Sequence, residues 1–197
     1  MNKFGGVQGQ PGSAFDLMAD AAKIWGLMAL RLAESSVLPL DHVVASKTLM
    51  GYVEQVKLYD NAALLELEPL EKAVRVYERA ASALEEEIHR HTNNVDHEED
   101  KIHRKKNDTV SLNDRIAYTE RRFLSPKGLP KRPYFRHVLQ APGLYLGYAS
   151  EVFPGVTQAC DDKDYRTANE QILVAATCVR KAANYLSPGI DNEENLV

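Results

Sequence analysis

The chain has 197 residues, a formal net charge of -4 and 44% hydrophobic residues. A chain of this length buries roughly 70% of its unfolded surface, so we expect one domain with a proper core. The acidic balance argues against nucleic-acid binding, which requires clustered Lys and Arg in excess. The longest apolar-rich segment, 24–32, is interrupted by Gly26 and Arg31. It is also far shorter than the ~20 residues that cross a bilayer. We therefore expect a soluble segment that contacts neither nucleic acid nor membrane.

Residues 1–13 are rich in Gly and Gln and lack the apolar stretch of a secretory signal. This composition is typical of a flexible tail or a cloning remnant. Cys160 and Cys178 are the only cysteines. Two cysteines are too few for a disulfide scaffold and lack the spacing of a metal pair, so we expect two buried free thiols.

Helical spacing of apolar residues begins at Asp16 and continues to Ser35, which predicts an amphipathic first helix. Asp41 is a suitable N-cap for a second helix. Its predicted buried face is Val44, Leu49, Tyr52, Val53 and Val56. A short helical turn over 62–67 follows, and a third helix is expected from about Pro69 to His91, with one apolar and one charged face.

The segment 92–109 mixes charges of both signs and has few large apolar residues, which predicts an exposed connection. Helical spacing returns from Ser111 until Pro126, and a short helix is expected from Pro154 to Cys160. The last helix is predicted over 165–186, followed by a disordered tail over 188–197. The predicted fold class is therefore all-α: a bundle of about four long helices.

A long Pro/Gly-rich stretch, 123–155, holds five of the nine prolines. Repeated Pro and Gly exclude one continuous helix or central strand, so we expect a long ordered loop. Its aromatic residues distinguish it from a mobile linker. It can serve as a rigid strap over the helices or face a ligand, since ordered loops do both. For Arg136 and His137, within the stretch, we favour a structural role that ties the loop to the helices.

Catalytic and metal-binding patterns are weak. His89 and His91 are two residues apart on a helix and point in different directions, and His97 and His103 lie in the charged connection. Metal ligands on a helix are instead three or four residues apart. The cysteines and serines stand in no recognisable nucleophile motif. We expect no metal site and no catalytic residue in this chain.

Three runs of sequence carry a family resemblance. FLSPKGLPKRPYFRHVLQAP (123–142), GYASEVFPG (147–155) and AKIWGLMALRLAESSVLPLD (22–41) are similar to the C-terminal helical domain of the glutamate carboxypeptidase and transferrin receptor family. The resemblance is closer to the carboxypeptidase branch. It implies a helical dimerisation domain over 14–187, a homodimer, and a neighbouring peptidase domain with two zinc ions. It further implies a membrane-anchored parent protein with an extracytoplasmic body.

The resemblance also implies one role in substrate binding. In the carboxypeptidases a lysine-tyrosine pair between the AP and FPG motifs lines the pocket for the substrate's C-terminal residue. Alignment of Ala141-Pro142 with AP places Tyr148 on the tyrosine and Gly147 on the lysine. A glycine cannot pair with a side-chain anion, so preference for a C-terminal glutamate is not expected.

Two functions remain open on the sequence. The chain is expected to be the non-catalytic dimerisation domain of a zinc carboxypeptidase, to whose pocket it contributes Tyr148. The alternative is a dimerisation or scaffold domain of a receptor-like protein without peptidase activity. For self-association, the expected surfaces are the first helix around Trp25 and Met28 and the alanine-rich final helix. Periodicity alone does not say which of the two helices is intramolecular core.

Overall fold

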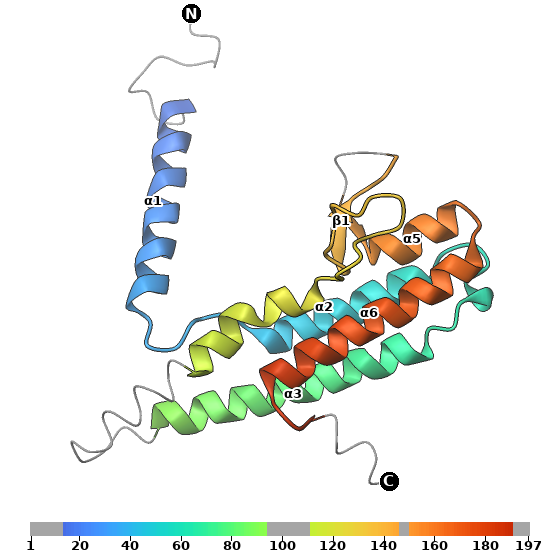
Figure 1. Ribbon diagram of the computed structural model, residues 1–197. Coiled ribbons are helices and arrows are strands. Elements are labelled where there is room, and N and C mark those ends of the chain that lie inside the picture. Colours follow the sequence, from blue (N-terminus) through green and yellow to red (C-terminus); the bar gives the residue numbers. More distant parts are fainter. Residues whose placement is uncertain (1–13, 94–110, 146–149, 191–197) are drawn as a thin grey trace, which may run out of the picture. The chain divides into compact units, whose positions relative to one another are not determined.

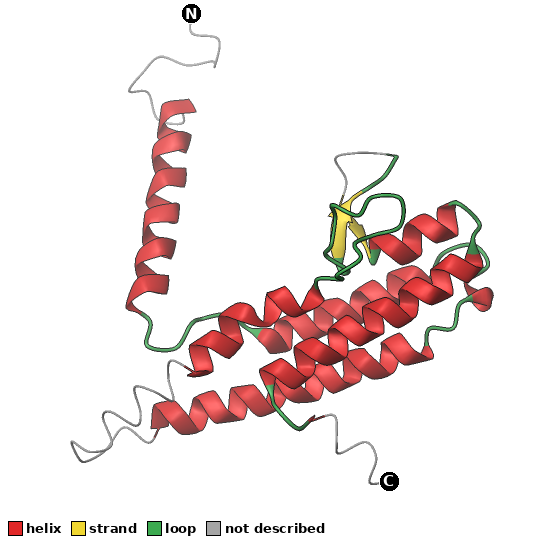
Figure 2. Cartoon of the chain, in the orientation of Figure 1, coloured by secondary structure: helices red, strands yellow, loops and turns green. Residues whose placement is uncertain are grey.

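The computed structural model describes residues 14–93, 111–145 and 150–190. The predicted tail at 1–13 lies outside these residues, as do most of the charged connection and most of the acidic tail. The chain divides after Pro39 into two units, which are described separately below. Within the described residues most of the chain is helical, as Figure 2 shows. The prediction of a mostly helical protein is confirmed.

The first unit contains α1, which spans Ala14–Glu34. Asp16 therefore lies in the first turn of the helix, where a carboxylate complements the helix dipole. Nearly every described side chain of α1 is exposed, including the large apolar ones. These are Phe15, Leu17, Met18, Ile24, Trp25, Leu27, Met28, Leu30 and Leu32.

The second unit is built around three long helices: α2 (His42–Lys57), α3 (Glu68–Asn93) and α6 (Tyr165–Leu186). Figure 1 shows them running beside one another, and α3 contacts both α2 and α6. A further helical stretch covers 111–118 and continues into the 3-10 helix η2, Thr119–Phe123. Asp41 caps α2 as predicted, because its Oδ1 accepts a hydrogen bond of 2.9 Å from the Val44 amide.

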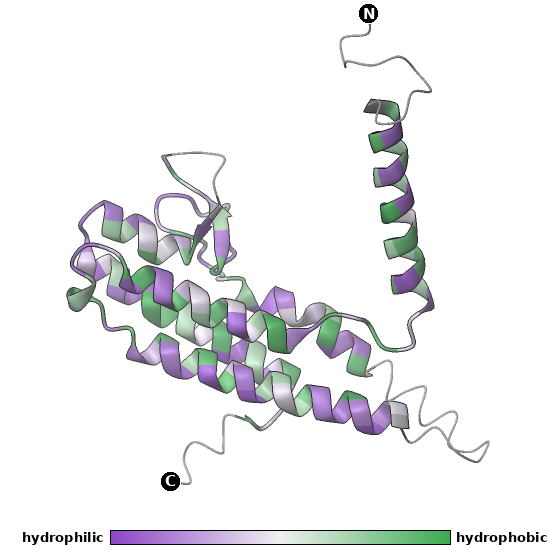
Figure 3. Ribbon diagram, turned by 180° about the vertical axis from the view of Figure 1, so that it is seen from behind, coloured by the Kyte–Doolittle hydropathy of each residue, from purple (hydrophilic) through white to green (hydrophobic). Residues whose placement is uncertain are grey.

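The core of this unit is formed largely by α3 and α6. On α6 the buried face is Ala168, Ile172, Ala175, Ala176, Cys178, Val179, Ala182, Ala183 and Leu186. The alanines allow α6 to approach its neighbours closely, and the stripe is thus intramolecular core. In α3 the charged residues lie away from this core, and the helix is largely hydrophilic in the rear view of Figure 3. Val44, predicted as buried, is exposed, because it lies in the first turn of α2.

The Pro/Gly-rich stretch is ordered in its described part but is not one loop. It contains a two-stranded antiparallel sheet of β1 (Gln140–Pro142) and β2 (Ser150–Val152), which the sequence did not predict. Helix α5 (Pro154–Asp161) follows directly and packs against both strands and α6. A short 3-10 helix, η1 (Ala62–Leu64), joins α2 to α3 near the position expected for a turn.

Candidate functional site

The strap, defined here as residues 124–139, folds back on itself before it reaches the hairpin. The Ser125 amide donates to the Arg136 carbonyl at 2.8 Å, and the Leu129 amide donates to the Phe135 carbonyl at 2.8 Å. Gly128 adopts a positive φ of 71°, and a side chain there would collide with the backbone of Pro133. Glycine is therefore required at this turn. The strap is a compact structure and not an open loop.

The two strands of the hairpin flank the loop for which the family resemblance predicts a role in substrate binding. Gln140 pairs with Val152, Ala141 with Glu151 and Pro142 with Ser150. The connecting loop is thus 143–149. Of this loop the structure describes residues 143–145, and Gly147 and Tyr148 lie outside the described residues. Their predicted role remains a prediction. The structure describes the strands on either side of the loop and the side chains that contact them.

Arg132 is one support of this hairpin. It lies in the strap, is only 7% exposed, and its Nη1 donates a hydrogen bond to the carbonyl of Pro142. Its Nη2 lies 3.8 Å from Oε2 of Glu151 on the opposite strand. Burial raises the pKa of the Glu151 carboxyl, while the charge of Arg132 opposes that shift. One guanidinium therefore contacts both strands of the hairpin.

A second support lies on the surface at the end of α5. Oδ2 of Asp162 is 2.8 Å from the Lys131 ammonium, and its Oδ1 accepts a hydrogen bond of 2.7 Å from the Tyr145 hydroxyl. The hydrogen bonds from Lys131 and Tyr145 lower the pKa of Asp162. Tyr145 is the last described residue before 146, so this contact joins the first part of the loop to the end of α5.

A pocket of ≈ 540 Å³ is lined mainly by residues from α2, α3, the helical segment 111–123 and the strap. His42 Nε2 is 3.1 Å from the Ile116 carbonyl and must donate to it, so the neutral ring accepts at Nδ1 from the Tyr77 hydroxyl at 2.8 Å. Burial lowers the pKa of His42 and raises that of Tyr77. The wall therefore presents a neutral, fully hydrogen-bonded imidazole and not a free base.

His137 lines the same pocket. Its Nδ1 accepts from the amides of Leu139 and Gln140, both at 3.3 Å, so its Nε2 is the atom that donates to Glu120 at 2.8 Å. This hydrogen bond lowers the pKa of the Glu120 carboxyl. Nε of Arg136 donates to the Ser125 carbonyl at 3.1 Å. His137 thus joins the strap to η2, as predicted, whereas Arg136 joins two parts of the strap to each other.

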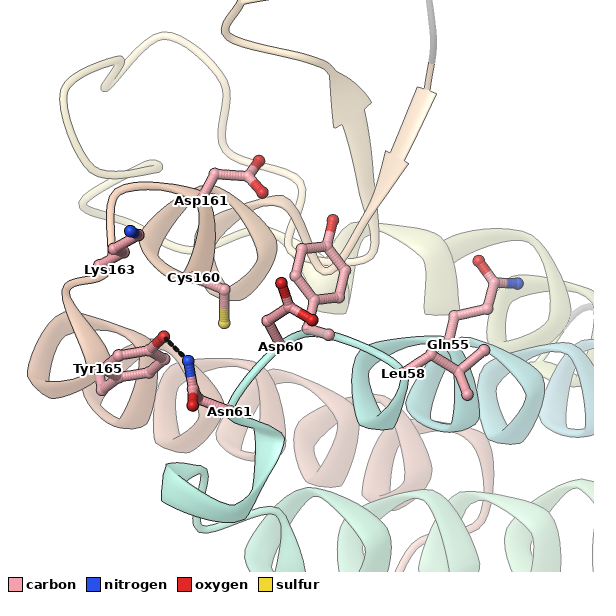
Figure 4. Close-up of a pocket in the computed structure, with 9 residues that line it drawn as sticks. Gln55, Leu58, Asp60, Asn61, Cys160, Asp161, Lys163 and Tyr165 are labelled. Atoms are coloured by element: carbon pink, nitrogen blue, oxygen red, sulfur yellow. Dashed lines mark hydrogen bonds between the residues drawn. The ribbon is translucent and has the colours of Figure 1, made fainter.

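A second pocket, of ≈ 570 Å³, lies where the end of α2 meets α5 and the start of α6. Figure 4 shows the Cys160 thiol directed into it, with Asp60 and Asp161 nearby and a hydrogen bond between Asn61 and Tyr165. Burial raises the pKa of Cys160 to about 11, so its thiol is protonated at neutral pH and is a poor nucleophile. Both cysteines are free and buried, as predicted. No pattern in the sequence indicates this pocket, because its residues come from two distant segments.

Among the described residues, no group of three or more His, Cys, Asp or Glu side chains is placed to hold a metal ion. His89, one of the histidines considered above, is exposed and paired with Glu85 at 3.3 Å, while His97 and His103 lie outside the described part. Of the helices that are described, none has the length and hydropathy needed to cross a membrane.

Comparison with known proteins identifies a family model, the transferrin receptor-like dimerisation domain, that matches residues 65–187. A probable glutamate carboxypeptidase of Arthroderma benhamiae is 30% identical over 182 residues, covering 91% of this chain and 24% of that protein. Transferrin receptor protein 1 of Gallus gallus is 32% identical over 183 residues, covering 91% of this chain and 22% of that protein. Aminopeptidase NAALADL1 of Rattus norvegicus is 28% identical, with coverages of 86% and 23%. The chain spans about a quarter of the length of these relatives.

Proposed function

Because the chain belongs to the transferrin receptor-like dimerisation domain family, we propose that it forms a homodimer and serves as the dimerisation module of a longer, peptidase-related protein. The match of the family model over 65–187 is the observation that carries this proposal. The exposed apolar side chains of α1 support it, because extended apolar patches on a protein surface mark association sites.

The proposal is tested by light scattering on the 197-residue chain over a concentration series. A dimer is expected, with the monomer fraction rising on dilution. A strict monomer at high micromolar concentration would contradict self-association through this chain.

The finer proposal is that the parent protein is a zinc-dependent carboxypeptidase and that the loop 143–149 contributes Tyr148 to its substrate pocket. Carboxypeptidases and an aminopeptidase among the relatives support a peptidase-related parent. The two zinc ions would be bound by the neighbouring peptidase domain, so the chain alone would have no hydrolase activity. A membrane anchor and an extracytoplasmic body remain part of this proposal.

Two variants of the full-length protein test the pocket contribution. Tyr148→Phe should lower kcat/KM by the loss of one hydrogen bond to an anionic group, worth about 1.5–3 kcal/mol. Gly147→Lys should shift preference toward substrates with an acidic C-terminal residue, because it adds a cation beside the tyrosine. If neither variant changes the kinetics, the loop does not contribute to the pocket.

A second candidate function is a scaffold domain of a receptor-like protein without peptidase activity. The 32% identity to transferrin receptor protein 1 favours it. The presence or absence of paired-metal His, Asp and Glu motifs in the rest of the parent sequence separates the two candidates.

A further inference from the structure

We propose that Arg132 is the positioning residue of the β1–β2 hairpin: its guanidinium joins the end of β1 to β2 and so holds together the two strands that the loop 143–149 connects. That the loop then serves a substrate pocket rests on the function proposed above. The positioning itself rests only on contacts within this chain.

The first observation is the burial of the charge. Arginine is seldom fully buried, and a buried charge is costly unless it is paired and hydrogen-bonded. The Arg132 side chain is nevertheless only 8% exposed. It lies near the ring of Phe135, with Cζ 5.5 Å from the ring centroid, and this contact holds the guanidinium against its own strap. A buried arginine of this kind requires an interaction that compensates for its desolvation.

The second observation is what the guanidinium contacts. Nη1 donates to the carbonyl of Pro142, the last residue of β1, and Nη2 faces Glu151, the middle residue of β2. Each strand has only three residues, so the sheet itself contributes few hydrogen bonds. A hairpin of this length is marginal without further support. Arg132 supplies that support at the point where the loop begins.

The third observation is the space made for Glu151. A Cβ added to Gly143 would lie 2.5 Å from Oε1 of Glu151. The first loop residue is therefore a glycine where the carboxylate passes close to the backbone. Since Nε and Nη2 of Arg132 and Oε2 of Glu151 have no hydrogen-bond partner among the described residues, the two charges compensate each other mainly by proximity. The pairing of Arg132 with Glu151 therefore depends on the backbone positions of Gly143 and β2.

The contact of Asp162 with Tyr145 provides a matched control. It also reaches the loop, but both side chains are on the surface, where a single polar contact contributes little. Tyr145→Phe removes the hydroxyl and keeps the ring. We therefore expect Arg132, and not Asp162, to hold the two strands of the hairpin together.

Amide hydrogen exchange of the 197-residue chain, followed by mass spectrometry on peptides that cover 140–152, tests the proposal. Arg132→Met should raise exchange of these peptides tenfold or more and leave peptides from the middle of α3 unchanged. Tyr145→Phe should change exchange less than threefold. Equal exchange in Arg132→Met and the wild type would overturn the proposal.

A double variant separates positioning from simple stability. Arg132→Met with Glu151→Met removes both charges, and replacing a buried ion pair with apolar residues is often neutral or stabilising. We expect the melting temperature to return toward that of the wild type while exchange at 140–152 stays raised, because the Pro142 carbonyl has still lost its donor. If exchange recovers together with the melting temperature, Arg132 only balances a charge and the proposal fails.

Kinetics of the full-length protein distinguish this inference from the proposed function. If the loop serves the pocket, Arg132→Met should raise KM more than it lowers kcat. Raised exchange with unchanged kinetics would support the positioning role of Arg132 and contradict the pocket contribution. Unchanged exchange would contradict the positioning role whatever the kinetics show.

Discussion

Helices α1 and α6 have similar sequence patterns and opposite environments. Both are amphipathic, 21 and 22 residues long. The apolar stripe of α6 is buried in the second unit, whereas nearly every described side chain of α1 is exposed. An apolar stripe thus shows that a helix has a buried face in the functional protein. It does not show whether the covering surface belongs to the same unit.

The width of the stripe adds a second distinction. With 100° per residue, the charged residues of α1 fall within one narrow arc, and apolar or small residues occupy roughly two thirds of the circumference. The charged residues are Asp16, Asp20, Lys23, Arg31 and Glu34. A helix that is apolar on most of its sides is normally enclosed by neighbours. We therefore expect α1 to pack against more than one surface in the assembled protein.

Matched Ile→Ala variants provide the largest contrast between the two helices. Ile172 on α6 is fully buried, so Ile172→Ala should lower the free energy of unfolding by about 2–5 kcal/mol through lost burial and the cavity left behind. Ile24 on α1 is 57% exposed, and Ile24→Ala should change the stability of the monomer by less than about 0.5 kcal/mol. Urea unfolding of both variants, at a concentration where the chain is monomeric, measures the difference. Similar losses would show that α1 is covered within the monomer.

The second contrast concerns self-association. Trp25 is 76% exposed and Leu173, on the outer face of α6, is 54% exposed. Trp25→Ser should weaken the dimer tenfold or more, about 1.4 kcal/mol, because buried tryptophans are frequent anchors of interfaces. Leu173→Ser is the control and should leave the dissociation constant within about twofold. Light scattering or sedimentation measures both.

The opposite ranking of these variants would place the interface on the outer face of α6 and would separate α1 from dimerisation. If both variants weakened the dimer equally, the interface would include both helices. Either result would contradict the assignment of α6 to the core and of α1 to a partner surface.

The helices were largely predictable from the sequence. The last helix was predicted over 165–186 and is observed at those residues, because a long stripe with a capping Asp164 and a Ser-Pro-Gly stop defines both ends. Val44 shows the limit of periodicity, which identifies a face but not how far along the helix its neighbours extend. The hairpin was missed because three-residue strands are too short for a pattern of alternation.

The candidate site was less predictable than the fold. The family resemblance predicted a substrate-binding role for Gly147 and Tyr148. Nothing in the sequence identified Arg132 and Glu151 as partners. They are separated along the chain, and only the folded strap brings them together. Likewise, the pairing of His42 with Tyr77 joins residues from two helices. Contacts of this kind depend on tertiary structure and leave no local signal.

The smallest expected effect concerns His42, a half-buried polar residue of the second unit. Burial lowers the pKa of His42 below its ordinary value of 6.5, although Asp41, Glu120 and the Ile116 carbonyl favour the charged ring. The unfolded chain therefore binds a proton more readily than the folded one. His42 contributes stability that is fully present above pH 6.5 and declines as the pH falls from 6.5 through the lower folded pKa. Each unit of pKa difference corresponds to about 1.4 kcal/mol.

Urea unfolding of the wild type and His42→Gln between pH 7.5 and 5.5 measures this contribution. The wild type should lose more stability on acidification than the variant, because glutamine does not titrate and the remaining histidines are common to both. The lowered pKa of Glu120 acts at lower pH, as its stabilising effect is lost only when the pH falls below the ordinary carboxyl value of 4.5. The window above pH 5.5 therefore isolates His42. Parallel pH profiles would mean that the ring titrates equally in both states, and that its hydrogen bonds to Tyr77 and Ile116 compensate fully for its burial.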